Sequence, residues 1–335
     1  MKEFHRKILI IRLSSLGDVL LTYPLIKLIK DRFPETQIDF LVKEHFADAI
    51  RTNPFLNETI LFKKENTRLI RNLIKEKGYD NIIDLQNNLR SKLLYLAALT
   101  KIFKFKKPTF KKLLFVYTKI NLLKNNQSIA KHYIDTFFRN ETINTIPIYF
   151  HIPEEVENRA KSIIQNQFEN EKIIGIAPGA KHYTKRYPVE LYKEVVNILV
   201  KKNFNVAIFG GFEDELICKE LTIDKSKTKN FQNNNDLLLT AGLMKNCKVL
   251  ISNDSGLMHL ASLLKIPTVA IFGSTVKEFG FFPIFEKSII VENPDLNCRP
   301  CSHIGKSECP KKHFKCMNDI SPNLIVRKVE ELLNG

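Results

Sequence analysis

Asp254, Ser255, Gly256 and His259 are the residues whose types and spacing point most directly to ligand binding. They follow an apolar run and open a short helical pattern, so they stand at a strand-to-helix junction. Gly256 lets a ligand approach the backbone, and the first N–H groups of the helix are free to bind an anion. His259, one turn into the helix, can add a donor or a positive charge. The alternative is that Asp254 or Ser255 only caps the helix and His259 packs against a neighbour.

A second set of candidate residues lies in the loop after the first strand and contains Ser15, Gly17 and Asp18. A carboxylate at the tip of such a loop can act as a general base, whereas the structural alternative is an acidic residue that offsets the dipole of the next helix. Gln86 and Arg90 follow a later strand. They are candidates for acceptor contacts, because ligands bind at the carboxyl ends of strands in open α/β sheets.

A third set lies in the second half of the chain, where Gly179 and Lys185 belong to one loop region. A compact ammonium there suits a phosphate charge, and the alternative is one more surface lysine. Glu213 follows two glycines and can accept hydrogen bonds from ribose hydroxyls, a role that Asp214 or Glu215 can also fill. No D-x-D motif that could hold a metal ion with a diphosphate is placed in these loops.

Four cysteines near the C-terminus follow the spacing C-x2-C-x7-C-x6-C. Four thiolates can hold a structural zinc ion, and C-x2-C is the usual half-site. The other half is wider than the knuckle of a zinc ribbon, so free or redox-active thiols are the alternative. The candidate ligands are Cys298, Cys301, Cys309 and Cys316, with His303 and His313 nearby.

Two series of alternating strands and helices position these residues. One begins with a continuous apolar strand at Lys7–Leu13, and the other begins at Lys172–Ala177, after a polar helical segment over 151–170. Two such series predict two α/β domains with a cleft. The other predicted strands are Gln37–Val42, Tyr79–Leu85, a strand near Ile146–Phe150, Phe204–Phe209, Val249–Ser252 and Thr268–Phe272. The predicted helices lie near Ile129–Arg139, at Val189–Lys202, around Asp236–Met244, at Leu257–Leu264 and at Ser321–Leu333.

The composition is that of a globular protein whose 335 residues leave room for two domains. No apolar run reaches the ~20 residues of a membrane span, and the run Ile8–Leu21 contains Arg12 and Asp18, which argues against a signal peptide. Six cysteines without a secretory segment indicate a reducing cytoplasm. The loop after the first strand lacks G-x-G-x-x-G, which argues against a nicotinamide-dependent oxidoreductase.

The basic excess of the chain is partly concentrated in one segment. The chain has 52 basic and 36 acidic residues, and its net charge is +16. Residues 101–131 hold nine lysines, interleaved with aromatic residues, and no Asp or Glu. Such a segment can bind nucleic acid, an anionic membrane surface or an anionic acceptor, and the alternative is a solvated lysine face. No RNA-binding signature, zinc finger or helix-turn-helix motif is present, so we expect no nucleic-acid partner.

Five motifs in order resemble those of one known family over nearly the whole chain. They are I-R-L-S-S-L-G-D-V-L-L-T, Y-D-N-I-I-D-L-Q-N-N-L-R-S, G-I-A-P-G-A with K-R-Y-P, F-G-G-F-E-D-E, and N-D-S-G-L-M-H-L-A. The family is that of the ADP-heptose:lipopolysaccharide heptosyltransferases, glycosyltransferase family 9. The chain departs from it at Tyr187, where Trp is usual, at Asn87, where Gly is common, and at Ser274, which replaces a Pro.

The resemblance implies the GT-B fold, with two facing Rossmann-like α/β domains built on parallel sheets. The implied domains are an acceptor-binding domain over 1–155 and a nucleotide-sugar-binding domain over 170–320. A C-terminal helix over 321–335 is a candidate for packing back on the first domain.

The resemblance also implies an inverting, metal-independent transfer of heptose from ADP-heptose to the lipopolysaccharide inner core, with Kdo-lipid A or heptosyl-Kdo as the acceptor. Asp18 matches the catalytic base of the family, Lys185 matches the lysine that contacts the diphosphate, and Asp254 matches a residue that hydrogen-bonds sugar hydroxyls. No cofactor is implied.

The implied partners are the nucleotide sugar, the lipopolysaccharide core precursor and the anionic inner face of the inner membrane, which the 101–131 segment would contact. The enzyme would then be cytoplasmic and peripheral to that membrane. The alternatives are a transferase of the same fold with another sugar or acceptor, and a non-catalytic binder of nucleotide sugars or anionic lipids. The sequence leaves open which heptose is added and the oligomeric state.

Overall fold

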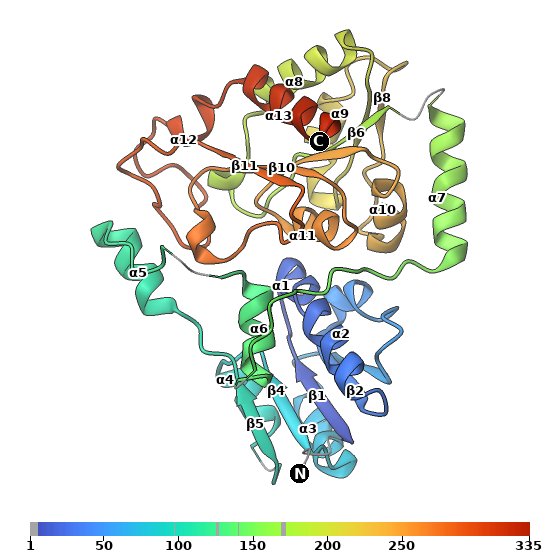
Figure 1. Cartoon of the computed structure of the whole chain (residues 1–335), viewed down its shortest axis with the longest axis vertical. Coiled ribbons are helices and arrows are strands. Elements are labelled where there is room, and N and C mark those ends of the chain that lie inside the picture. The colour runs from blue at the N-terminus through green and yellow to red at the C-terminus, as the bar shows by residue number, and fades with distance from the viewer. Residues whose placement is uncertain (1–5, 97, 125–126, 140, 169–171) are drawn as a thin grey trace. The chain divides into compact units, whose positions relative to one another are not determined.

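The computed structural model of the chain describes residues 6–335, except 97, 125–126, 140 and 169–171. The chain forms two compact units, one of Met1–Pro108 with Ile129–His151 and one of Thr109–Ser128 with Ile152–Gly335. Each unit contains one parallel β-sheet with helices packed against it (Figure 1). The predicted α/β class with two parallel-sheet domains is therefore confirmed.

The first unit is built on the five-stranded sheet β3-β2-β1-β4-β5, in which all strands are parallel. Its elements are β1 (Lys7–Ile11), α1 (Leu16–Leu20), α2 (Tyr23–Arg32), β2 (Gln37–Lys43), η1 (Glu44–Ala49), β3 (Glu58–Phe62), α3 (Thr67–Lys77), β4 (Asn81–Asp84), α4 (Leu89–Leu94), β5 (Lys101–Lys104) and α6 (Ile129–Phe137). Residues Ile8 to Ile11 of β1 are fully buried, because β1 is central in the sheet and apolar on both faces. On one of these faces Leu9 and Ile11 pack with Ile70 and Ile74 of α3.

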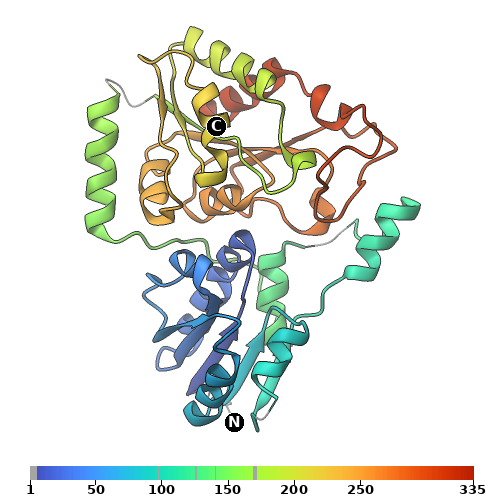
Figure 2. The ribbon, with the colours of Figure 1, turned by 180° about the vertical axis from the view of Figure 1, so that it is seen from behind.

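The second unit is built on the six-stranded sheet β11-β10-β9-β6-β7-β8, which is also all parallel. Figures 1 and 2 show α8 and α13 on one side of this sheet and α10 and α11 on the other. The elements are α5 (Thr109–Thr118), α7 (Glu154–Gln167), β6 (Ile173–Ala177), η2 (Tyr183–Lys185), α8 (Val189–Lys201), β7 (Asn205–Ile208), η3 (Phe212–Asp214), α9 (Glu215–Glu220), β8 (Thr228–Asn230), α10 (Leu237–Met244), β9 (Val249–Asn253), α11 (Gly256–Leu263), β10 (Thr268–Phe272), η4 (Lys277–Phe279), β11 (Ser288–Glu292), α12 (Lys315–Asn318) and α13 (Pro322–Asn334).

Both sheets have the strand order of a Rossmann-type fold, and in each the first strand lies beside the fourth. Strand order reverses at that point, so the loops after these two strands diverge and leave room for a ligand at their carboxyl ends. In the first unit these are the loops after β1 and β4, which carry Asp18 and Gln86. In the second unit they are the loops after β6 and β9, which carry Lys185 and Asp254.

The domain boundaries differ from the prediction in two places. Residues Thr109–Ser128 were expected in an N-terminal domain over 1–155, yet they belong to the second unit. The C-terminal helix was a candidate for packing back on the first domain, and in the structure α13 packs on α8 and on strands β9, β10 and β11 of the second unit. The reason is apolar burial, because Ile325, Val326 and Val329 are part of the core of that unit.

The strand predicted near Ile146–Phe150 is wrong. These residues are all described by the structure and form no strand. Their aromatic side chains pack on a helix instead, since the rings of Tyr149 and Phe150 lie 5.2 Å and 5.1 Å from the ring of Tyr23 in α2. This apolar run is therefore explained by side-chain packing without a ladder of backbone hydrogen bonds.

Candidate functional site

Asp18 lies in α1, directly after β1, and its carboxylate is held by residues of the first unit. Arg12 Nη2 is 2.6 Å from Oδ1, and the Ser15 backbone N–H and hydroxyl donate to Oδ2 at 3.1 Å and 2.8 Å. The Tyr133 hydroxyl of α6 donates to Oδ1 at 3.3 Å. Asp18 is largely buried, with 14% of its side chain exposed. A carboxylate held this way has a defined orientation and keeps access to a ligand.

The electrostatic surroundings keep Asp18 ionised. Burial alone would raise its pKa, but the charge of Arg12 and the hydrogen bonds from Ser15 and Arg12 outweigh burial, so the pKa of Asp18 is lowered below its ordinary value. The carboxylate is therefore a proton acceptor at neutral pH. Lys107 adds a further cation here, and burial together with the charge of Arg12 lowers its pKa.

Arg12, Tyr133 and Lys107 were not among the predicted site residues. Arg12 was visible in the sequence as a charged residue at the end of an apolar strand, which is a recognisable signal. Its guanidinium is buried and also donates from Nη1 to the Leu85 carbonyl at 2.6 Å. Tyr133 and Lys107 reach Asp18 only through the fold, because they are 115 and 89 positions away in sequence.

The other predicted residues of the first unit lie around the same loop. The Gln86 side-chain oxygen accepts from the Leu13 and Ser14 N–H groups at 3.0 Å and 3.3 Å, so Gln86 joins the loops after β4 and β1. Gly17 is in α1, and its carbonyl accepts from Leu21. Arg90 lies on α4 and is exposed. The fold therefore brings Ser15, Gly17, Asp18 and Gln86 together and leaves Arg90 on the surface.

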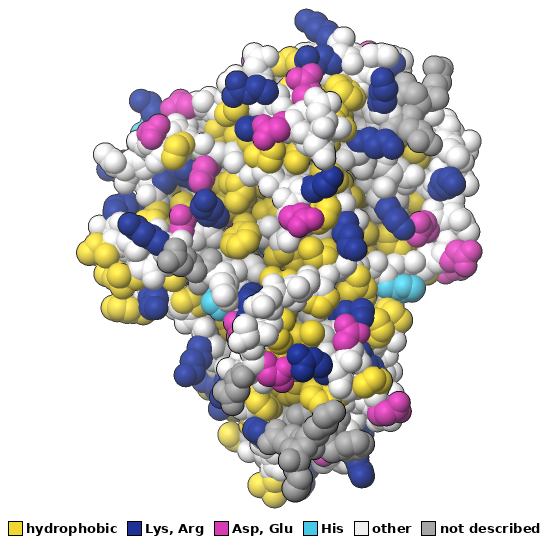
Figure 3. Space-filling model, in the orientation of Figure 1, with side chains coloured by type: hydrophobic (Ala, Val, Ile, Leu, Met, Phe, Trp, Pro, Cys, Tyr) yellow, Lys and Arg dark blue, Asp and Glu magenta, His cyan; other side chains and the backbone are white. Residues whose placement is uncertain are grey.

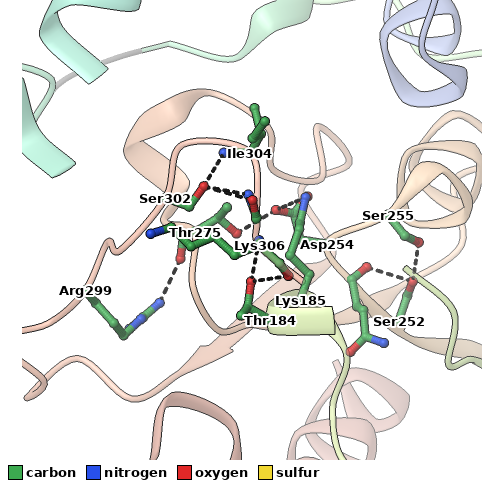
Figure 4. Close-up of polar contacts among 12 residues, drawn as sticks. Thr184, Lys185, Ser252, Asp254, Ser255, Thr275, Arg299, Ser302, Ile304 and Lys306 are labelled. Atoms are coloured by element: carbon green, nitrogen blue, oxygen red, sulfur yellow. Dashed lines mark hydrogen bonds and ion pairs between the residues drawn. The ribbon is translucent and has the colours of Figure 1, made fainter. Parts of the chain in front are cut away.

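Lys185 and Asp254 form an ion pair in the second unit (Figure 4). Lys185 Nζ is 2.7 Å from Asp254 Oδ2, and the two side chains are 16% and 6% exposed. The hydroxyl of Thr275 donates to the same oxygen at 2.7 Å. Lys185 is therefore not an ordinary surface lysine. Asp254 does not act as the helix cap, because Ser255 holds the N-cap position of α11.

Two backbone connections support this pair from the loop after β11 (Figure 4). Thr184 N–H donates to the Lys306 carbonyl at 3.1 Å, and Lys306 N–H donates to the Thr184 hydroxyl at 2.8 Å. Gly305 in this loop has φ +108°, and a Cβ there would lie 2.5 Å from His182 Cβ. The loop can approach this closely because residue 305 is glycine. Lys185 is thus positioned by residues about 120 places further along the chain.

Arg299 holds the loop that carries Thr275. Its guanidinium is buried and donates to the carbonyls of Gly273 and Thr275 at 2.5 Å and 3.0 Å. It also pairs with Glu292 Oε2 at 2.7 Å, at the end of β11. A planar five-donor group is suited to this task, because it satisfies several acceptors from one buried position. Neither Arg299 nor Thr275 was predicted, and no motif in the sequence signals them.

Asn253 is a further residue that the prediction missed. Its side-chain oxygen accepts from the Tyr187 N–H at 3.1 Å, and its amide donates to the Pro178 carbonyl at 2.7 Å. It therefore joins the loop after β6 to the end of β9. Its place before Asp254 in the N-D-S-G motif was the available signal.

The three carboxylates after Gly211 have different surroundings. Asp214 accepts from the Gly211 N–H at 3.1 Å and lies so close to Gly179 that a Cβ there would be 2.4 Å from its carboxylate. Burial raises the pKa of Asp214. Glu215 pairs with Lys219 at 2.6 Å. Glu213 is exposed, which leaves it the best placed of the three to meet a ligand.

The helix that follows Asp254 brings His259 into the interior. His259 is 3% exposed, and its ring lies 6.3 Å from the ring of Phe281. Ser255 and Gly256, at the start of α11, are half-buried, and the Ser255 hydroxyl is 3.4 Å from that of Ser252. The start of the helix is therefore more accessible than His259.

The four C-terminal cysteines lie in the region that follows β11, and all are free thiols. Cys298 Sγ is 3.9 Å from His313 Nε2, and burial raises the pKa of Cys316 to about 12. Among the described residues, no group of three or more His, Cys, Asp or Glu side chains could hold a metal ion. The structural zinc site stays a prediction.

Comparison with known proteins relates both units to one group of enzymes. The sequence model of glycosyltransferase family 9 (heptosyltransferase) matches residues 67–312. Lipooligosaccharide heptosyltransferase 2 of Campylobacter jejuni is 27% identical over 331 residues, covering 96% of each chain. Lipopolysaccharide heptosyltransferase 2 of Escherichia coli K12 is 25% identical over 350 residues, covering 98% of each. The solved structure of the E. coli ADP-heptose lipopolysaccharide heptosyltransferase II has the same fold, with a TM-score of 0.78, 22% identity and 98% of each chain covered.

Proposed function

We propose, from the premise that this chain belongs to glycosyltransferase family 9, that it transfers heptose from ADP-heptose to the lipopolysaccharide inner core. The observation that carries the proposal is the similarity to heptosyltransferase 2 over 96% of both chains. The geometry of the two units supports the chemistry, because one presents an ionised carboxylate and the other a cation beside a helix start.

Asp18 is the general base in this proposal. Its ionised carboxylate takes the proton of the acceptor hydroxyl as that oxygen forms a bond to the anomeric carbon of heptose. The bond from this carbon to the diphosphate oxygen breaks, and ADP leaves with the bonding electrons. Attack from the face opposite the diphosphate inverts the anomeric configuration. Arg12 and Ser15 are positioning residues that hold the carboxylate in its ionised form.

The second unit binds the donor in this proposal. Lys185 and the free N–H groups at the start of α11, with Ser255 and Gly256, hold the diphosphate and stabilise its charge as ADP leaves. His259 lies one turn further into α11, in the interior, and supports this site from behind. Lys185 pairs with Asp254 in the structure, so the ammonium is already held at the carboxyl ends of β6 and β9. Asp254 hydrogen-bonds hydroxyls of the heptose, Glu213 those of the ribose, and Gly179 lets the ligand approach the backbone.

Residues of the first unit complete the proposal on the acceptor side. Ser15 and Gly17 contact the acceptor around Asp18, with Gln86 beside them in the loop after β4, and Arg90 contributes from the exposed side of α4. The transfer requires no metal, because Lys185 and the helix start supply the positive charge.

The place of action in this proposal is the cytoplasmic face of the inner membrane, where the chain binds peripherally. Among the helices that the structure describes, none is long and apolar enough to cross a membrane. Figure 3 shows Lys and Arg side chains interspersed with Asp and Glu over the face it presents. The positively charged side chains behind the net charge of +16 therefore form no continuous patch on this face. In this proposal a particular segment makes the contact with the membrane.

The test is the release of ADP from ADP-heptose with lipid A–Kdo and heptosylated Kdo offered separately, for the wild type and Asp18→Asn. We expect turnover that depends on one of the acceptors and is lost in the variant. Tight ADP binding without turnover on either acceptor would overturn the assigned sugar and acceptor and leave the family membership standing.

A further inference from the structure

Helix α5 carries large apolar side chains on its exposed side as well as on its covered side. Its sequence is TFKKLLFVYT, and it lies within the lysine-rich segment 101–131. A surface helix normally turns its apolar stripe to the protein core and its polar side to water. Clustered apolar side chains that remain exposed mark a surface for a partner or a membrane.

The covered side is fixed to the second unit by both cations and apolar contacts. Lys112 is buried, and its ammonium donates to the Phe279 carbonyl at 2.8 Å and lies 4.8 Å from the centre of the Phe281 ring. Phe115 packs in the cluster around Phe279. Lys119, directly after the helix, donates to the Pro300 carbonyl at 2.7 Å. Residues 112 and 115 share one side by helical spacing, so this is the docked side of α5.

On another side of the helix, large apolar side chains are mostly exposed to solvent. Phe110 is 77% and Tyr117 79% exposed, and these two residues are two turns apart on one face. Ile120 and Leu122, just after the helix, are each 54% exposed. We call these four residues the α5 apolar face. Figure 3 shows hydrophobic side chains gathered at the edge where Figure 1 places α5.

The charges of the segment that carries the α5 apolar face are all positive. Lys111 and Lys124 are exposed, one within the helix and one just after it. No Asp or Glu occurs between residues 101 and 131. Exposed aromatic and aliphatic side chains flanked by lysines are the features of a helix that lies in the interface of an anionic bilayer. Two other lysines of the segment, Lys112 and Lys119, serve a different purpose, since they fasten the helix to the protein.

We propose that the α5 apolar face docks on an anionic lipid bilayer, with Phe110, Tyr117, Ile120 and Leu122 inserted below the headgroups and Lys111 and Lys124 paired with lipid phosphates. The proposal rests on the peripheral membrane location proposed above and adds the residues that make the contact. Vesicle binding is measured without sugar or acceptor, so its failure would leave the proposed transfer reaction standing. The lipid is favoured over a second protein copy because the segment has lysines and not a single acidic residue that could pair with them across a two-fold contact.

The first test uses the absence of tryptophan from the chain. In Tyr117→Trp the single indole reports the surroundings of the α5 apolar face. The control is Leu216→Trp, at a residue of the same unit that is 78% exposed and lies on α9 between Glu215 and Glu220. We expect vesicles of phosphatidylglycerol and phosphatidylethanolamine to shift the emission of Tyr117→Trp to shorter wavelength and to leave that of Leu216→Trp unchanged. An unchanged emission spectrum of Tyr117→Trp would overturn the proposal.

The second test removes the face. We expect Phe110→Ser/Tyr117→Ser/Ile120→Ser/Leu122→Ser to bind the same vesicles at least about tenfold more weakly. Its melting temperature should match the wild type, since all four side chains are exposed. Lys111→Gln/Lys124→Gln should weaken binding to anionic vesicles and reduce its salt dependence. Unchanged vesicle binding by the serine variant, or a lipid-free dimer that the serine variant loses, would overturn the membrane proposal.

Discussion

At the scale of single residues, the two proposed catalytic groups are each held by a partner of opposite charge. Asp18 is held by Arg12, and Lys185 is held by Asp254. Both pairs are largely buried, so the attraction between the two charges of each pair is stronger than in a surface pair. The partner of each proposed catalytic group therefore helps to determine how that group behaves.

The Arg12 pair makes a prediction about pH. In the wild type the lowered pKa of Asp18 keeps the base ionised, so its contribution to kcat/KM is lost only as the pH falls through a pKa below the ordinary value of 3.8. In Arg12→Met burial is no longer outweighed, so the pKa of Asp18 rises. We expect the acidic limb of the kcat/KM profile to move to higher pH, as measured by ADP release across pH.

A matched control for this prediction is Tyr133→Phe. It removes one 3.3 Å hydrogen bond to Asp18 without removing a charge, so the acidic limb should move much less. Identical profiles for Arg12→Met and the wild type would contradict the assignment of Asp18 as the base.

The Lys185 pair makes a prediction about stability. Lys185→Gln leaves the buried carboxylate of Asp254 without its cation, which should cost about 3 kcal/mol in the free energy of unfolding. Lys185→Gln/Asp254→Asn removes both charges and should recover most of that loss. We expect both variants to lose ADP affinity in calorimetry, so recovered stability without recovered binding would separate the two roles. Full ADP affinity in Lys185→Gln would contradict the proposed diphosphate contact.

At the scale of elements, the ends of β9, β10 and β11 are tied into one support for Asp254. Arg299 connects the loop after β10 to the end of β11, and that loop presents Thr275 to Asp254. The backbone carbonyls that Arg299 satisfies are in the interior, where an unpaired acceptor is costly. The orientation of Asp254, the carboxylate proposed to bind the sugar, thus depends on a guanidinium that touches no ligand in the proposed reaction.

This support predicts a specific loss in Arg299→Lys. The variant keeps the positive charge and loses the planar guanidinium with its several N–H donors. Several buried carbonyls then lose their donor, so the free energy of unfolding should fall by about 2–4 kcal/mol. The variant Thr275→Val removes only the hydroxyl bonded to Asp254 and should cost about 1 kcal/mol. Chemical denaturation measures both. Equal losses in the two variants would show that the loop is not held by Arg299.

The loop with the cysteines makes a separate prediction. If Cys298, Cys301, Cys309 and Cys316 hold zinc, protein purified without a His tag contains about one zinc per chain. Chelation then lowers the melting temperature, because metal binding is coupled to folding. Zinc well below one per chain would leave these residues as free thiols. In either case we expect ADP release to survive chelation, since the proposed transfer uses no metal.

At the scale of the whole molecule, the chain divides its chemistry between two units with separate cores. One core contains Leu9 and Ile11 of β1, and the other contains Ile174 and Ile176 of β6. Each unit has a Rossmann-type strand order, and each presents its candidate residues where the strand order reverses. We therefore expect that the proposed donor binding and the proposed base catalysis can be altered independently.

This division predicts how ADP stabilises the protein. Ligand at about 100 times its Kd adds about 2.7 kcal/mol to the stability of the state that binds it. We expect ADP to raise the melting temperature of the wild type and of Asp18→Asn to the same extent, and to have little effect on Lys185→Gln. Loss of the ADP shift in Asp18→Asn would contradict the assignment of donor binding to the second unit.

Much of the fold could be predicted from local patterns. The continuous apolar runs that became β1 and β6 are buried on both faces, and the N-D-S-G motif stands at the strand-to-helix junction where it was expected. The strands β3, β5, β8 and β11 were not predicted, since each contains polar residues and few buried ones and none is a continuous apolar run. The prediction for 146–150 was wrong because a short apolar run that packs its aromatic side chains on a helix cannot be told from a strand by sequence alone.

By itself, the sequence determined the two-domain α/β class, the family and which residues stand at the ends of strands, because these depend on spacing within a few residues. Only the tertiary structure decided that Tyr133 meets Asp18, that Asp254 pairs with Lys185, and that Arg299 holds the loop of Thr275. It also decided that α5 joins the second unit and leaves an apolar face uncovered. The physical reason is that these contacts join distant positions, and their geometry follows from strand order and from which apolar surfaces are buried together.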